Sequence, residues 1–157
     1  MLKCGHINVG GWTVNNQDLR VSLIKIINTD IISLNETHLG GDDTLDLKSY
    51  GFERYGHNRF ATHRNAPKPS GGVGFLVKQS VFNSFHVRVL DKAYDGILGL
   101  ELRHKDTDTS IAMFTCYLPP ENSPWGRDAD SLFFAFTNPD LSKLWYGFNF
   151  SIRGFQC

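Results

Sequence analysis

A carboxylate stands directly after a short apolar run near the start of the chain. The run IISLN (residues 31–35) is followed by Glu36, and Asn8 stands near the end of an earlier apolar segment. A carboxylate at a strand end has a rigid backbone while its side chain can face a cleft. Mg²⁺ needs only one or two protein carboxylates beside waters and substrate phosphate oxygens. These residues therefore indicate a hard-cation site, and the ordinary polarity of loops is the competing interpretation.

Two neighbouring motifs have a chemical and a structural interpretation. His38 follows Glu36 closely and could donate a hydrogen bond that supports the metal ligand. An exposed loop histidine is the more common case. Gly71-Gly72-Val73-Gly74 has the composition of a phosphate cradle, but the helix and lysine of a P-loop do not follow it. We expect these glycines to permit a tight entry into a strand instead.

Charge is balanced overall but unevenly distributed. Sixteen basic and sixteen acidic residues cancel, so net charge does not point to nucleic acid or a membrane. Residues 54–90 contain no Asp or Glu but carry Arg54, Arg59, Arg64, Lys68, Lys78 and Arg88. Because acidic stretches flank this segment, it is either a positive surface for a polyanion or a solvated loop region. Arg59, Arg64 and Lys68, together with His57 and His63, are candidates for contacts to a DNA backbone.

The first part of the chain has the pattern of a strand–helix–strand unit. Residues 2–9 predict a strand that ends at Gly10-Gly11, residues 15–28 predict a helix, and residues 30–36 predict a buried strand. Asn15 or Asn16 is the expected N-cap. The helix carries apolar side chains at helical spacing, which predicts that this face is buried: Leu19, Leu23, Ile26 and Ile27. The order predicts an α/β protein, and parallel strands would bring Asn8 and Glu36 out side by side.

The rest of the chain is richer in strands. Residues 57–72 predict a loop from their Gly and Pro content, and four strands follow at 73–78, 85–90, 96–104 and 110–117. Alternating apolar residues at 85–90 and at 96–104 predict half-buried strands, and an antiparallel meander of the four strands is expected. An amphipathic stretch that starts at Asp128 or Asp130 ends before Pro139. These elements are fewer than a complete two-sheet sandwich contains.

Cysteine usage and the N-terminus indicate an intracellular protein, nuclear or cytoplasmic. Cys4, Cys116 and Cys157 lack metal spacing, and an odd number argues against a disulfide framework. Reduced thiols are the expectation. The N-terminus has no signal-peptide pattern, and no apolar stretch reaches membrane-spanning length.

Five motifs occur in a characteristic order along this α/β pattern. They are GHINVGGW (5–12), NETHLG (35–40), GHNR (56–59), SGGVGFLVK (70–78) and YLPPEN (117–122). Together they resemble the endonuclease/exonuclease/phosphatase superfamily. More narrowly, they are similar to the apurinic-type endonuclease domain of non-LTR (LINE-type) retrotransposons. The similarity covers about residues 1–130, so residues 131–157 are expected to form a divergent or poorly ordered tail.

The resemblance implies a fold, a reaction and a set of site residues. The implied fold is a four-layer α/β sandwich, here partial because much of the second half is missing. Glu36 would be the ligand of Mg²⁺ (or Mn²⁺), Asn8 would orient the catalytic centre, and Tyr117 would contact the scissile phosphate or support its neighbours. The implied reaction is metal-assisted hydrolysis of a DNA phosphodiester, which nicks the strand.

The family's downstream motifs are not found in this sequence. They are an Asp-Phe-Asn motif that positions the nucleophile and a Ser-Asp-His motif whose His contacts the phosphate. YGFNFS (146–151) has no Asp between Gly147 and Phe148, and no His follows His104. We therefore expect a C-terminally truncated domain with weak or no activity, which self-associates through an exposed sheet face.

Two alternatives remain open from the sequence. One is a non-catalytic remnant that binds nucleic acid or protein through the basic segment 54–90. The other stays within the superfamily but hydrolyses a phosphoinositide or another small phosphodiester. The LINE-like motifs GHNR and YLPPEN favour DNA over the latter.

Overall fold

In the computed structural model, residues 1–59, 70–91 and 96–117 are described, and they form two β-sheets and one α-helix. The strands and the helix follow in the order β1 (Cys4–Asn8), α1 (Gln17–Ile27), β2 (Ile31–Asn35), β3 (Phe52–His57), β4 (Val73–Lys78), β5 (Phe85–Asp91), β6 (Ile97–His104) and β7 (Ser110–Cys116). Short 3₁₀ turns lie at Val14–Asn16, Lys48–Tyr50 and Gln79–Asn83. None of the described helices is long and apolar enough to cross a membrane.

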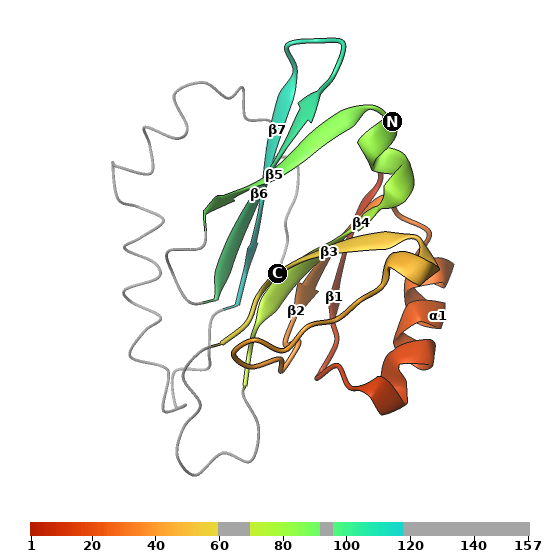
Figure 1. Cartoon of the computed structure of the whole chain (residues 1–157), viewed down its shortest axis with the longest axis vertical. Helices are drawn as coiled ribbons and strands as arrows, with labels where there is room; N and C mark the ends of the chain where they lie inside the picture. The colour runs from red at the N-terminus through yellow and green to blue at the C-terminus, as the bar shows by residue number, and fades with distance from the viewer. Residues whose placement is uncertain (60–69, 92–95, 118–157) are drawn as a thin grey trace.

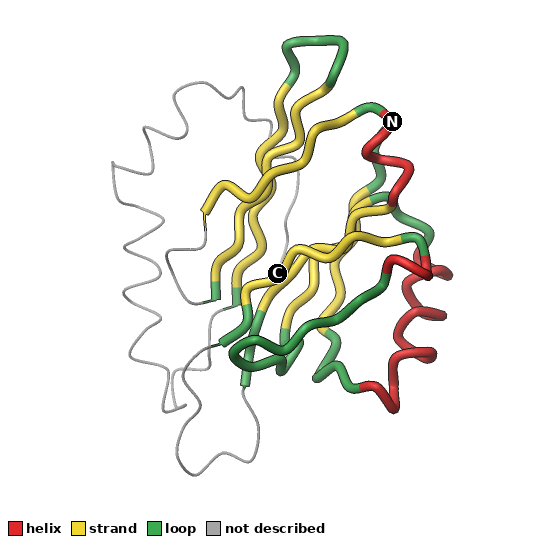
Figure 2. Tube along the Cα trace, in the orientation of Figure 1, coloured by secondary structure: helices red, strands yellow, loops and turns green. Residues whose placement is uncertain are grey.

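The strands divide into a four-stranded and a three-stranded sheet. The first has the order β1-β2-β4-β3, in which β1 and β2 are parallel and the other pairs are antiparallel. The second is the antiparallel meander β5-β6-β7. Figures 1 and 2 show α1 on the outer side of the first sheet, away from the second. The described residues thus form helix, sheet and sheet layers, as expected for a partial α/β sandwich.

Strand β2 is buried on both faces, which explains its continuous apolar sequence. Ile32 and Leu34 belong to the core between α1 and the four-stranded sheet. Ile31 belongs to the second core, which lies between the two sheets. A strand that buries both faces loses the alternation of polar and apolar residues. Ser33 and Asn35 are polar residues on the face of β2 that packs on the three-stranded sheet. They therefore need hydrogen-bond partners there.

The predicted βαβ unit and most predicted strands are confirmed. One strand was not predicted, and the predicted partners of another strand are wrong. The sequence predicted no strand at residues 52–57, where β3 forms, because FERYGH has no regular apolar alternation. In addition, β4 does not belong to the meander but pairs with β2 and β3. Neighbours in a sheet are set by tertiary packing, which a local pattern cannot report.

The predicted buried face of α1 is also wrong. The helix buries Val21 and Ile24, whereas Leu19, Leu23, Ile26 and Ile27 are 63%, 38%, 77% and 39% exposed. Both sets repeat at helical spacing, so periodicity alone could not choose between them. The entry to the helix sets its rotation, since the Arg20 guanidinium donates to the Gly11 carbonyl at 2.9 Å. The predicted N-cap at Asn16 is confirmed as a position, without a side-chain capping bond.

Candidate functional site

The parallel pairing of β1 and β2 brings the predicted site residues to one edge of the sheet. Asn8 is the register partner of Asn35, the residue that precedes Glu36. The Val9 amide extends this pairing by donating to the Asn35 carbonyl at 3.0 Å. The sequence-based expectation that Asn8 and Glu36 emerge from neighbouring strand ends is therefore confirmed.

Glu36 has a backbone conformation that is rare for a residue with a side chain. Its φ is 53°, in the left-handed region, and His38 has a φ of 55°. A non-glycine residue in this region costs about 1–3 kcal/mol and persists only where surrounding contacts enforce it. The Gly11 amide provides one such contact by donating to the Glu36 carbonyl at 2.7 Å. The carboxylate is thus aimed by a strained and tightly held turn rather than by an ordinary loop.

The glycine pair before β4 holds the same turn from the other side. The amides of Thr37 and His38 donate to the carbonyls of Gly72 and Gly71 at 3.2 and 2.8 Å. Both glycines have positive φ, and a Cβ on Gly72 would lie 2.5 Å from the Thr37 hydroxyl oxygen. The pair therefore permits a close approach to the Glu36 turn, as well as the predicted tight entry into a strand.

Asn8 acts on this turn through the backbone. Its side-chain oxygen accepts a hydrogen bond from the Gly10 amide at 3.0 Å. This bond shapes the Gly10-Gly11 turn, whose next amide donates to the Glu36 carbonyl. The contact is consistent with a residue that orients Glu36 rather than one that reacts itself.

Tyr117 follows β7 and brings a phenol from the second sheet to Glu36. The pKa of Tyr117 is raised, first by burial and then by the charge of Glu36 and a side-chain hydrogen bond to it; the charge of Arg59 acts in the opposite direction. The ring packs on Gly71, where a Cβ would lie 3.1 Å from it. The Tyr117 amide is fixed by the Gly96 carbonyl at 2.8 Å. A carboxylate, a phenol and a guanidinium therefore meet where the two sheets come together.

The basic candidates do not form an exposed patch among the described residues. Arg59 is only 2% exposed and acts on Tyr117 from inside the site. His57 is also buried, and its Nδ1 lies 2.8 Å from the Ile97 carbonyl oxygen, so that it links β3 to β6. Arg64 and Lys68 lie outside the described residues. A role of these cations in DNA binding stays a prediction.

The number of possible metal ligands near Glu36 bears on which metal ion could bind there. Within residues 1–59, 70–91 and 96–117, no group of three or more His, Cys, Asp or Glu side chains could hold a metal ion. A structural zinc site needs about four such ligands. Mg²⁺ keeps several waters and is often bound through one or two carboxylates plus substrate phosphates. Glu36 with water and phosphate oxygens therefore fits Mg²⁺ or Mn²⁺.

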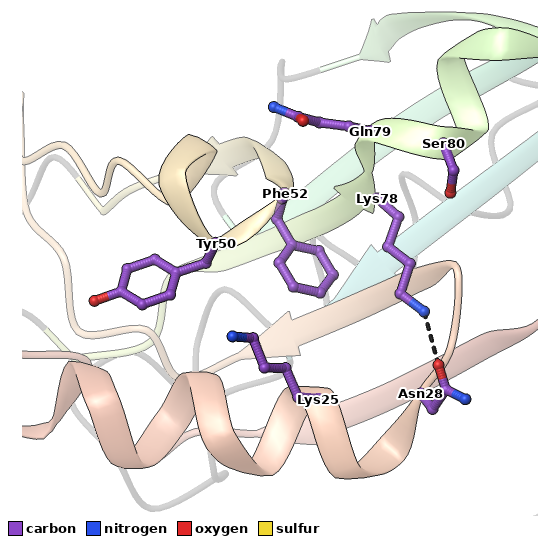
Figure 3. Close-up of a pocket in the computed structure, with 8 residues that line it drawn as sticks. Lys25, Asn28, Tyr50, Phe52, Lys78, Gln79 and Ser80 are labelled. Carbon is purple, nitrogen blue, oxygen red and sulfur yellow. Dashed lines mark hydrogen bonds between the residues drawn. The ribbon is translucent and has the colours of Figure 1, made fainter.

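A polar hollow lies at the opposite end of the four-stranded sheet. It measures about 350 Å³ and is lined by the end of α1, the start of β3 and the end of β4. Figure 3 shows Lys25, Phe52 and Lys78 around it, with the Lys78 ammonium donating to the Asn28 side-chain oxygen at 2.9 Å. No predicted site residue lines this hollow, so the Glu36 edge remains the candidate site.

Comparisons with known proteins identify the fold. Neither a protein-family model nor a curated protein matches the sequence. Among solved structures, the AP endonuclease LMAP from Leishmania major has a TM-score of 0.63 and 18% identity, covering 92% of this chain and 47% of that chain. The 3′ phosphatase NExo from Neisseria, bound to a product DNA hairpin, has a TM-score of 0.57 and 16% identity, covering 92% and 53%.

A third solved structure, of a human protein, has the same fold. The catalytic domain of human Nocturnin with a bound sulfate anion has a TM-score of 0.54 and 14% identity, covering 87% of this chain and 57% of that chain. This chain spans about half the length of the solved structures that it matches. It has the fold of the endonuclease/exonuclease/phosphatase proteins over that half.

Proposed function

We propose that this chain is part of a Mg²⁺- or Mn²⁺-dependent endonuclease that hydrolyses DNA phosphodiesters. The observation that carries the proposal is the meeting of Glu36 with Tyr117 at the end of a doubly buried strand. Residues held in strained backbone conformations cluster at active sites and ligand sites, which supports a function for the Glu36 carboxylate. A hard-cation ligand is the task that its chemistry suits.

Each residue of the site has a part in this proposal. Glu36 would hold the cation, and Asn8 keeps the Gly10-Gly11 turn that fixes the Glu36 backbone. When bound, a divalent cation polarises the phosphoryl oxygen and stabilises the leaving oxyanion. Tyr117, whose hydroxyl shares a hydrogen bond with Glu36, would support that ligand or turn its single proton toward the scissile phosphate. The buried Arg59 adds positive charge beside it, which favours an anionic substrate.

DNA is the proposed substrate, and a LINE-type retrotransposon endonuclease the proposed kind of enzyme. The motifs GHNR and YLPPEN support the LINE-type assignment. Two solved structures with the same fold, an AP endonuclease and a phosphatase bound to product DNA, support DNA as the substrate. The fold alone does not select a substrate, so this part rests on the motifs.

The activity of the chain itself is proposed to be weak. The sequence contains neither a Gly-Asp-Phe-Asn nor a Ser-Asp-His motif. A group that positions or activates the nucleophile contributes roughly 10²- to 10⁴-fold to a hydrolytic rate. Residues that act as a unit lose their effect together, so Glu36 alone supports only slow cleavage.

The non-catalytic alternative gains no support from the described cations of segment 54–90. The Arg54 guanidinium donates to Asn58, the Lys78 ammonium donates to Asn28, and the Arg88 guanidinium pairs with Glu101. The Glu101 carboxylate offsets the charge of Arg88, whereas the neutral amides of Asn58 and Asn28 occupy a donor of Arg54 and of Lys78 without changing their charge. Binding through this segment would need Arg64 and Lys68 above all.

The proposal is tested by nicking of supercoiled plasmid with the protein in large excess and Mg²⁺ or Mn²⁺ present. The expected result is slow, divalent-dependent nicking that Glu36→Gln abolishes. Glu53→Gln is the matched control, because Glu53 is a partly exposed carboxylate paired with Lys48 away from the site. Nicking that survives Glu36→Gln would refute the assignment of Glu36. Complete absence of nicking with retained DNA binding would favour the non-catalytic alternative.

A further inference from the structure

A continuous series of hydrogen bonds crosses from one sheet to the other next to the candidate site. His6 Nδ1 lies 3.0 Å from Ser33 Oγ, and Ser33 Oγ donates to Thr115 Oγ1 at 2.7 Å. Thr115 Oγ1 donates to Asn35 Oδ1 at 3.0 Å, and Asn35 Nδ2 donates to the Cys116 carbonyl at 2.9 Å. These four side chains, His6, Ser33, Thr115 and Asn35, are called the inter-sheet chain below.

Proton counting gives the inter-sheet chain one direction. A hydroxyl group has a single proton to donate. The Ser33 proton goes to Thr115 and the Thr115 proton goes to Asn35, so the bond between His6 and Ser33 requires a proton on His6 Nδ1. Every hydroxyl then both donates and accepts. A fully satisfied series of this kind is rigid, whereas breaking one member leaves a buried group without a partner.

The inter-sheet chain lies in a mostly apolar interface. Ser33 and Asn35 are two residues apart on β2, so they share the face that packs on the three-stranded sheet. Thr115 is only 3% exposed. The surrounding contacts come from residues such as Ile31, Phe75 and Leu100. Apolar contacts are not directional, so hydrogen bonds fix the sheets relative to one another: the bond of His57 to the Ile97 carbonyl acts between β3 and β6, and the inter-sheet chain acts between β2 and β7, next to the site.

The inter-sheet chain ends one residue before the site on both strands. Asn35 directly precedes Glu36, and Cys116 directly precedes Tyr117. One residue is a rise of about 3.3 Å along a strand. A slide of β7 against β2 by that distance would separate a carboxylate and a phenol that now share a hydrogen bond.

We propose that Ser33, Thr115 and Asn35 are positioning residues that hold Glu36 and Tyr117 in register across the two sheets. Their importance for catalysis rests on the proposed function of Glu36 and Tyr117. The competing role is only structural: the hydrogen bonds satisfy polar groups in the interface and the site residues find each other without them. The two roles differ in what happens to Tyr117 when one hydroxyl is removed.

Three substitutions on β7 separate these roles. Thr115→Val removes the hydroxyl and keeps the shape, whereas Thr115→Ser keeps the hydroxyl and removes a methyl group. Ser110→Ala is the matched control, since the Ser110 hydroxyl donates to Glu101 at 2.8 Å and lies outside the inter-sheet chain. The readouts are the surroundings of the Tyr117 ring, followed at neutral pH by the NMR chemical shifts of ¹³C-labelled tyrosine, and the affinity for Mn²⁺. Tyr117→Phe identifies the signal.

The expected result is specific to the hydroxyl. Thr115→Val shifts the ring signals of Tyr117 toward those of Glu36→Gln, because the phenol loses its hydrogen bond to Glu36. It also weakens Mn²⁺ binding several-fold. Thr115→Ser and Ser110→Ala leave both readouts at the wild-type value.

The opposite pattern overturns the proposal. If Thr115→Val lowers the unfolding midpoint while the Tyr117 chemical shifts and the Mn²⁺ affinity stay unchanged, the inter-sheet chain is only structural. Ser33→Ala, at a half-buried position, gives the same test if Thr115→Val does not fold. Wild-type protein that binds no Mn²⁺ at Glu36 would refute the proposed function, and the Tyr117 chemical shifts would still decide the positioning role.

Discussion

At the scale of single residues, the site depends on backbone conformation as much as on side-chain type. Glu36 and His38 both have left-handed φ values, and the turn between them is held by the amide of Gly11 and the carbonyls of Gly71 and Gly72. Strain at one residue is offset by hydrogen bonds from two separate loops. The position of the carboxylate is therefore a property of three chain segments together.

The first prediction concerns Gly72. Gly72→Ala is expected to destabilise the protein by about 2 kcal/mol more than Gly10→Ala, because the strain of a positive φ is common to both and a clash, which typically costs about 1–3 kcal/mol, is added at Gly72. Both glycines have positive φ, but only at Gly72 does a Cβ meet another group, the Thr37 hydroxyl at 2.5 Å. Urea denaturation measures the difference. Equal losses for the two variants would mean that the Gly72 approach does not hold the turn.

The sequence predicted that Asn8 and Glu36 lie at neighbouring strand ends, but not their environment. Their place after apolar runs was enough for this, because polar residues at the ends of parallel strands share an edge. The burial of Arg59 and His57 was not predictable, since a loop-like sequence with Gly and Pro gives no sign that its cations turn inward. Ser33, Asn35 and Thr115 also gave no signal, because single Ser, Thr and Asn residues are common in strands.

At the scale of elements, the apolar pattern predicted most of the strands and failed where packing decides. Strand β3 has polar residues at positions that the pattern expects to be apolar, and only its ends, Phe52 and His57, are buried. Helix α1 has apolar residues around most of its circumference, so the sequence could not say which face the sheet covers. In both cases the answer comes from neighbours that are distant in sequence.

The second prediction concerns the end of β7. Burial raises the pKa of the Cys116 thiol from 9.0 to about 11. The folded protein therefore keeps this proton at pH values where the unfolded chain loses it. The contribution to stability is present below pH 9 and is lost as the pH rises through about 11. The free energy of unfolding should fall more steeply over this range in wild-type protein than in Cys116→Ala.

Chemical denaturation at several alkaline pH values, in wild-type protein and Cys116→Ala, measures this contribution. The comparison cancels the tyrosines, which ionise in the same range in both proteins. Parallel pH profiles would show that the Cys116 thiol is not protected by the end of β7.

At the scale of the whole molecule, the described residues form one half of a larger kind of architecture. Two sheets pack through a shared apolar core, and one helix covers the outer face of the four-stranded sheet (Figure 1). Among the described strands, β1 and β3 lie at the edges of the first sheet and β5 and β7 at the edges of the second. Strand edges and exposed apolar side chains both favour association between copies.

The third prediction follows from the outer face of α1. At high concentration the protein is expected to self-associate, and Ile26→Lys should shift the association to several-fold higher concentration, because Ile26 is 77% exposed. The same change should alter stability by less than about 0.5 kcal/mol, as is usual for exposed positions. Sedimentation velocity over a range of concentrations measures both proteins. If Ile26→Lys associates at the same concentration as wild-type protein, the contact between copies does not involve the outer face of α1, and the sheet edges are the remaining surface.

The central claim is that Glu36, at the end of the doubly buried strand β2, is a metal ligand. Binding of Mn²⁺, measured by the enhancement of water-proton relaxation, tests it most directly. The wild-type chain and Glu53→Gln should give the same saturable titration, and Glu36→Gln should weaken the affinity about tenfold or more, a loss of about 1.4 kcal/mol. The same titration curve for Glu36→Gln and wild-type protein would contradict the account.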